Sequence, residues 1–121
     1  MRVIIDLIED VREQIGNSED YTVSAGLLKT DETDSTRLKY AGEALINSFD
    51  LDRNARQLIF KIDGSDHKLT IKELIPSVLI LDMDAMMFEL KLDVNAQYKD
   101  MEIVGFGKND EEKRYILFIK I

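Results

Sequence analysis

The 121-residue sequence predicts one α+β domain, in which an N-terminal amphipathic helix packs on a mostly antiparallel sheet of about five to seven strands. Apolar residues recur every three or four positions in residues 4–15 and every second position in several later segments. The chain is 45% hydrophobic and 33% charged, which is enough apolar material for one core. Residues 1–121 are therefore expected to form a single domain.

The helix is predicted by a stripe of four apolar residues, Ile4, Ile8, Val11 and Ile15. Gly16 and Asn17 are expected to end it. From residue 21 to residue 27 the apolar period changes to two, which predicts a half-buried strand.

Two hairpins are predicted in the next forty residues. Turn-forming residues 31–35 separate the first strand from a short second strand at residues 38–41. Residues 44–51 and 57–62 form another expected pair, and Leu58, Phe60 and Ile62 share one face of it.

The segment 63–77 is more ambiguous. Thr70-x-x-Glu73 has the form of a capping box and favours one additional short helix near residues 70–76, with a strand as the alternative. Pro76 would shorten or kink that helix.

The last third of the chain predicts three strands. Phe88, Leu90, Leu92 and Val94 alternate with polar residues, and segments 101–106 and 114–121 read as a terminal hairpin. The final strand is apolar on both sides, with Ile116 and Phe118 opposite Leu117 and Ile119. Either a second layer or a partner is expected to cover the Ile116 side, which permits a homodimer.

Composition excludes several classes of site. The chain has no cysteine and one histidine, His67, so disulfides, thiolate chemistry and zinc sites with two histidines are ruled out within one chain. We expect no metal and no cofactor. Apolar runs such as residues 78–81 are far short of the roughly 20 residues that a membrane helix requires. A cytoplasmic location and no membrane contact are expected.

The net charge of −8 argues against direct binding of nucleic acid, because a phosphate backbone is bound by clustered Lys and Arg. The excess is uneven. Residues 1–50 hold 11 acids and 5 bases, whereas residues 51–121 hold 13 acids and 11 bases. The first fifty residues therefore carry six of the eight excess negative charges.

An acidic helix face is the main candidate for a partner-binding site. Asp6, Glu9, Asp10 and Glu13 fall on the side of the helix opposite the apolar stripe. Two acidic turns would extend this surface if the fold brought them close, and they contain Asp31, Glu32 and Asp34, and Asp110, Glu111 and Glu112. The alternative is a solvated face that only maintains solubility.

Other patterns give weaker support for a metal-binding or catalytic site. Asp50-x-Asp52-x-Asn54 imitates the start of a calcium loop, but Ala55 and Lys61 stand where glycine and glutamate are required. Asp82-x-Asp84 specifies no geometry, and His67 would need a serine such as Ser65 or Ser77 beside it. Four methionines more often fill a core than form an adaptable patch, namely Met83, Met86, Met87 and Met101.

The sequence thus favours a non-catalytic protein-binding domain, an adaptor, inhibitor or structural component that acts through an acidic surface on a protein partner with basic character. One alternative is an immunity or anti-nuclease inhibitor that mimics nucleic acid. Another is an acidic chaperone of secretion or assembly. The rival class is a small carboxylate-dependent enzyme built from Asp82, Asp84 and His67.

Overall fold

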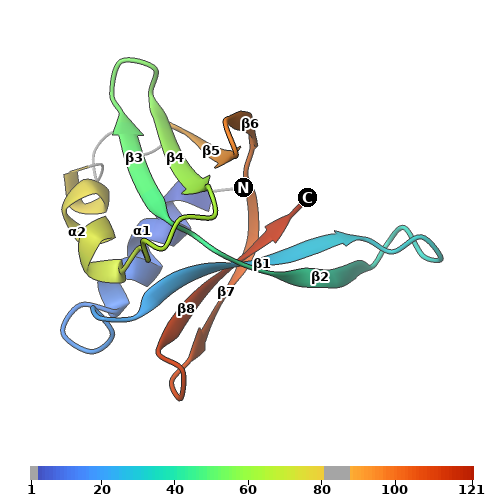
Figure 1. Ribbon diagram of the computed structural model, residues 1–121, viewed down its shortest axis with the longest axis horizontal. Coiled ribbons are helices and arrows are strands. Elements are labelled where there is room, and N and C mark those ends of the chain that lie inside the picture. Colours follow the sequence, from blue (N-terminus) through green and yellow to red (C-terminus); the bar gives the residue numbers. More distant parts are fainter. Residues whose placement is uncertain (1–2, 81–87) are drawn as a thin grey trace.

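The computed structural model describes residues 3–80 and 88–121, and this part of the chain holds two helices and eight strands (Figure 1). In chain order they are α1 (Val3–Glu13), β1 (Thr22–Thr30), β2 (Leu38–Leu45), β3 (Ser48–Asp52), β4 (Gln57–Ile62), α2 (Ile71–Ile80), β5 (Glu89–Val94), β6 (Gln97–Asp100), β7 (Glu102–Asn109) and β8 (Arg114–Lys120). The α+β class is confirmed.

The arrangement of the strands differs from the prediction of one mostly antiparallel sheet of five to seven strands. Four strands form sheet A, in the order β2-β1-β8-β7, and four form sheet B, in the order β3-β4-β5-β6. Each sheet is mixed, because its two central strands, β1 with β8 and β4 with β5, run parallel. Local alternation of apolar residues shows that a strand exists but not which distant strand lies beside it.

The two sheets are joined at corners where the chain passes from one to the other. Residues 46–47 connect β2 to β3, and Met101 connects β6 to β7. These corner residues are buried, and Ile46 is fully enclosed. At the first corner three backbone hydrogen bonds form a ring. The N–H of Val23 donates to the carbonyl of Leu69, the N–H of Leu69 donates to the carbonyl of Ile46, and the N–H of Ile46 donates to the carbonyl of Val23. This ring ties β1, the corner and the segment before α2 together.

The two halves of the chain repeat one topology, although no repeat is visible in the sequence. Each half is a helix followed by four strands, α1 with β1–β4 and α2 with β5–β8. Matching β1 to β5, β2 to β6, β3 to β7 and β4 to β8 converts every pairing of sheet A into a pairing of sheet B, with the same direction. Each sheet therefore contains one hairpin from each half.

Helix α1 follows the predicted stripe over most of its length. Ile4, Ile8 and Val11 are buried, and Leu7, which the predicted stripe omits, is fully buried beside them. Ile15 is 42% exposed, because the helix ends at Glu13, before that residue. The buried residues of α1 belong to one core cluster that also includes residues of α2 and of both sheets.

Helix α2 begins after Thr70, as the capping pattern predicts, with Glu73 N–H bonded to the Thr70 carbonyl at 3.1 Å. It continues to Ile80, beyond the expected limit near residue 76. Pro76 lies inside the helix and is exposed. The buried residues Ile71, Leu74 and Val78 lie on one side and anchor the helix to the core in spite of the proline.

Candidate functional site

The predicted acidic face of α1 is divided by the fold. Asp6, Glu9 and Glu13 are exposed, whereas Asp10 is half-buried and accepts a hydrogen bond from the hydroxyl of Tyr115. Tyr115 is almost fully buried on β8, and this burial, followed by the bond to Asp10, raises the pKa of its hydroxyl. Asp10 thus has a structural partner within the chain, and three acids of the face remain directed to solvent.

The acidic turn between β1 and β2 lies far from α1. This hairpin projects from the body as an arm, and its tip is at the opposite end of the molecule from the helix (Figure 1). Within the tip, Asp31 and Asp34 accept hydrogen bonds from Thr33 and Thr36. These bonds lower the pKa of both carboxyl groups. Asp31, Glu32 and Asp34 therefore do not extend the acidic face of α1.

The second acidic turn, between β7 and β8, comes close to the segment that joins α1 to β1. Tyr21 donates a hydrogen bond of 2.7 Å to Asp110, and the accepting carboxylate raises the pKa of Tyr21. Lysines accompany these acids, since Lys113 lies 3.5 Å from Asp20 and Lys108 lies 3.8 Å from Asp110. The negative charge of this region is partly balanced.

The weaker candidates do not converge in the structure. His67 Nε2 lies 3.2 Å from Glu73, both side chains are exposed, and no serine is bonded to the imidazole among the described residues. Asp52 accepts a hydrogen bond from the Ala55 N–H, which closes the β3–β4 turn. Met101 is buried in the core. The pair Asp82 and Asp84 and the other three methionines, Met83, Met86 and Met87, lie outside the described residues.

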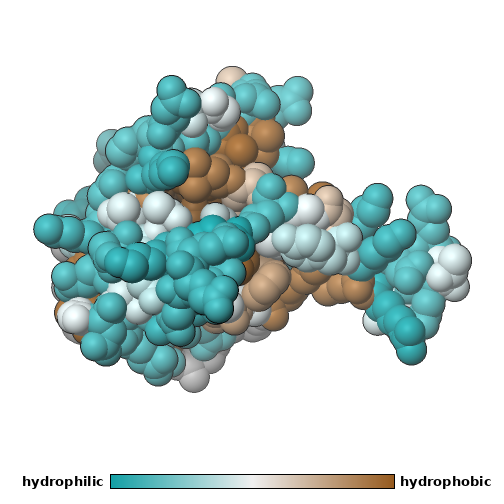
Figure 2. All heavy atoms as spheres, turned by 60° about the horizontal axis from the view of Figure 1, so that its bottom comes forward, coloured by the Kyte–Doolittle hydropathy of each residue, from teal (hydrophilic) through white to brown (hydrophobic). Residues whose placement is uncertain are grey.

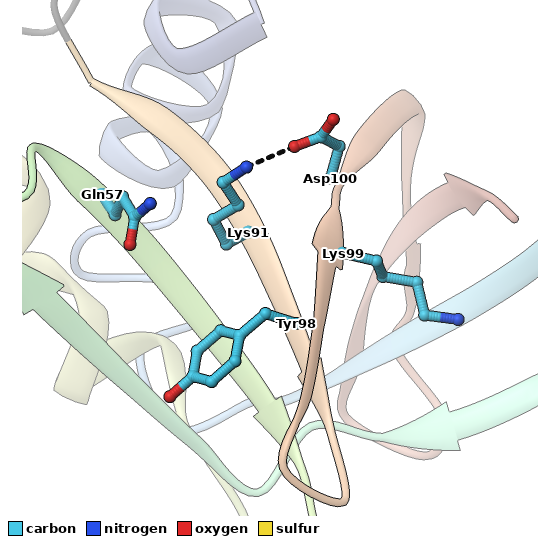
Figure 3. Close-up of a pocket in the computed structure, with 5 residues that line it drawn as sticks. All are labelled: Gln57, Lys91, Tyr98, Lys99 and Asp100. Carbon is cyan, nitrogen blue, oxygen red and sulfur yellow. Dashed lines mark hydrogen bonds and ion pairs between the residues drawn. The ribbon is translucent and has the colours of Figure 1, made fainter.

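A pocket on sheet B is lined by Gln57, Lys91, Tyr98, Lys99 and Asp100 (Figure 3). Lys91 points to Asp100 and forms an ion pair with it, whereas Tyr98 and Lys99 point away from that pair in different directions. Hydrogen bonding to Asp100 raises the pKa of Lys91, which keeps the amine charged. A charged, paired lysine is a poor nucleophile or base, so the pocket offers no catalytic group of evident strength.

The outer face of sheet A is the most distinctive surface. Strand β8 directs Tyr115, Leu117 and Ile119 toward α1 and the core, so Ile116 and Phe118 point to the opposite side. The register places apolar residues of β1 and β2 on that same side. We define the outer face of sheet A by Leu28, Leu38, Tyr40, Leu45, Ile116 and Phe118.

None of these six residues belongs to the core cluster, and each is at least partly exposed. Leu38 is 43% exposed and Tyr40 is 56% exposed. Figure 2 shows hydrophobic surface where the β1–β2 arm joins the body. The sequence identified the unusual apolar character of Ile116 and Phe118, but the contributions of β1 and β2 depend on strand register, which local pattern does not specify.

Glycines beneath Phe118 shape the centre of this face. A Cβ atom added to Gly26 would lie 2.7 Å from the Phe118 ring, and one added to Gly107 would lie 2.8 Å from it. Gly105 is also near, at 3.8 Å. The ring therefore lies directly over the backbones of both neighbouring strands, β1 and β7. This arrangement gives the middle of the outer face of sheet A a flat surface.

Comparisons with protein-family models, curated proteins and solved structures found no match to the chain. Among residues 3–80 and 88–121, no group of three or more His, Cys, Asp or Glu residues is arranged to hold a metal ion. No helix within these ranges is long and apolar enough to span a bilayer.

Proposed function

We propose that this chain is a non-catalytic protein-binding domain whose contact surface is the outer face of sheet A. The observation that carries the proposal is an apolar sheet face outside the core cluster, with Tyr40 and Leu38 substantially exposed. Contiguous apolar surface rimmed by polar residues is typical of protein interaction sites. Exposed tyrosine and a central phenylalanine are the residue types that such sites favour.

The equivalent face of sheet B supports this choice by contrast. The register places Asp50, Asp52, Lys61, Glu89, Lys91, Asp93, Tyr98 and Asp100 on the side of sheet B away from the core. Ile59 on that side is only 6% exposed, so polar neighbours shield it from water. One topology thus carries a solvated face on sheet B and an apolar one on sheet A. Folding alone does not require the apolar face to remain open.

The acidic residues have a secondary role in this proposal. Asp6, Glu9 and Glu13 are exposed on α1, away from the arm, so they act through their field rather than by contact with the bound partner. Their dispersal gives less support to mimicry of nucleic acid, which requires one continuous acidic surface. An adaptor or assembly role needs no such surface and agrees better with an apolar contact face.

Site-specific photo-crosslinking in the native host tests the proposal. A photoreactive phenylalanine analogue placed at Tyr40 is expected to form covalent adducts with protein. The matched control is Tyr98, which is 61% exposed on β6, the counterpart of β2 in sheet B. Adducts at residue 40 and few at residue 98 support the proposal. No adduct at residue 40, or equal yields at both positions, contradicts it.

A further inference from the structure

We propose that the occupant of the outer face of sheet A is a second copy of this chain, so that two molecules pack face to face through these sheets. The inference rests on the proposed binding face and adds the identity of the partner. A dimer of this kind is isologous, because the same residues of both copies meet across a two-fold axis. Leu28, Tyr40 and Phe118 of one copy then lie against the same set in the other.

The charge on this face favours a second copy over a basic protein. Six charged residues surround the apolar centre, the acids Glu43, Glu102 and Glu112 and the bases Lys68, Arg114 and Lys120. Three acids and three bases give a net charge of zero, although the whole chain carries −8. Counted in the same way, with Lys99 from its pocket included, the outer face of sheet B has five acids and three bases, a net charge of −2. Two acidic molecules repel each other least through the neutral face, whereas a basic partner would be attracted elsewhere.

Ion pairs already present within the chain reduce the cost of contact. Arg114 pairs with both Glu43 and Glu112 at the end of the face where β1 begins. Hydrogen bonding to Glu43 raises the pKa of Arg114 further above its ordinary value. A second copy that covers Arg114, Glu43 and Glu112 does not leave these three charges buried without a partner, which is the main penalty for charges at an interface.

The shape of the face also suits an identical sheet. Phe118 covers Gly26 and Gly107, so the centre is flat, and packed sheets approach to about 10 Å when their side chains fit together. Four strands about 4.8 Å apart and about seven residues long at about 3.3 Å each give a projected area of roughly 450 Å². Twice this value, roughly 900 Å² for both copies, is below the roughly 1,200 Å² of stable specific interfaces and is typical of weak, transient association. We therefore expect a dissociation constant in the micromolar range.

Sedimentation velocity of the full chain from about 1 to 300 μM tests the inference. The wild type should shift from one chain, 13.9 kDa, to twice that mass as concentration rises. Tyr40→Glu places two like charges in the interface and should raise the dissociation constant at least ten-fold. Tyr98→Glu makes the same change at the matched position of sheet B and should alter it less than two-fold. Circular dichroism should confirm that both variants are folded.

Salt dependence separates a second copy from a basic partner. Added NaCl screens the repulsion between two chains of charge −8, so the dimer should become tighter between 0.05 and 0.5 M salt. A monomer at every concentration overturns the inference, as does equal weakening by Tyr98→Glu or a dimer that dissociates with added salt. If the chain is monomeric but residue 40 still crosslinks to another protein, the second copy is rejected and the binding face is retained. If the chain is monomeric and residue 40 forms no crosslink, both proposals are rejected.

Discussion

Asn47 is a single buried residue on which a whole loop depends. It lies at the corner between β2 and β3 and is 2% exposed. Its Nδ2 group donates 3.0 Å hydrogen bonds to the carbonyls of Ser65 and His67, and its Oδ1 accepts from the N–H groups of Asp63 and Gly64. All the hydrogen-bonding capacity of the amide is thus used in holding the loop that precedes α2.

Asn47→Asp should therefore be strongly destabilising, although it preserves side-chain shape. Replacing the amide NH₂ by oxygen removes both donated hydrogen bonds, places a carboxylate oxygen against two carbonyl oxygens and buries a charge. We therefore expect a loss of about 3 kcal/mol in the free energy of unfolding. Urea denaturation at pH 7 measures this loss. Asn54→Asp, in the exposed β3–β4 turn, is the control and should change stability by less than about 0.5 kcal/mol. A loss below about 1 kcal/mol for Asn47→Asp would show that the loop does not depend on this residue.

The hydrogen bond from Tyr115 to Asp10 predicts a pH-dependent contribution to stability. The pKa of Tyr115 is raised by burial and by this bond, whereas tyrosine in the unfolded chain ionises near pH 10. The stabilisation is therefore complete below pH 10 and is lost as the pH rises above that value, because the unfolded chain releases its proton first.

Tyr115→Phe should lower stability by about 2 kcal/mol at pH 7, as expected for loss of a hydrogen bond to a charged group. Above pH 10 the difference from wild type should shrink by about 1.4 kcal/mol per pH unit. Urea denaturation from pH 7 to 11 measures both effects. Tyr98→Phe is the control, because Tyr98 is exposed and should show neither. A difference that is constant with pH would contradict the assigned role of the hydroxyl.

The sequence predicts which segments form helices and strands better than it predicts which strands pair with each other. The apolar stripe locates α1, and alternation locates β4 and β5 within one residue of their observed bounds. Strand β6, whose four residues Gln97–Asp100 are all exposed, has no apolar pattern, so the sequence does not predict it. The acidic clusters were visible in the sequence, but their separation by the length of the arm is a property of the fold. The parallel pairs are likewise non-local, and no residue pattern encodes them.

The contact between Phe118 and the glycines of sheet A predicts coupled effects of substitution. Gly26→Ala would place a Cβ atom 2.7 Å from the ring and should cost about 1–3 kcal/mol, because the phenylalanine must move. In a Phe118→Ala background the same change should cost less by at least about 1 kcal/mol, which a double-mutant cycle of unfolding free energies measures. Gly105→Ala meets the ring at an ordinary 3.8 Å and is the control. Additive costs would show that the ring does not occupy this position.

The two topologically equivalent halves of the chain are interlocked rather than adjacent. Each sheet is completed by a parallel pair that joins strands from different halves, β1 with β8 and β4 with β5. The backbone ring of Val23, Ile46 and Leu69 joins the first half to the segment before α2. One core cluster contains residues from both sheets and both helices. Neither half retains a complete sheet without the other, so separate unfolding of the halves is disfavoured.

Cooperative unfolding of the entire chain follows from this interlocking. Leu117 on β8 and Leu58 on β4 are both fully buried on corresponding strands of sheets A and B. Replacing either by alanine should cost about 2–5 kcal/mol. Because the sheets share one core, each substitution should lower protection from hydrogen exchange by a similar free energy in β1 and β8 and in β4 and β5. Exchange measured by mass spectrometry, read strand by strand, tests this expectation. Loss of protection confined to the substituted sheet would show two independent folding units and contradict the single core.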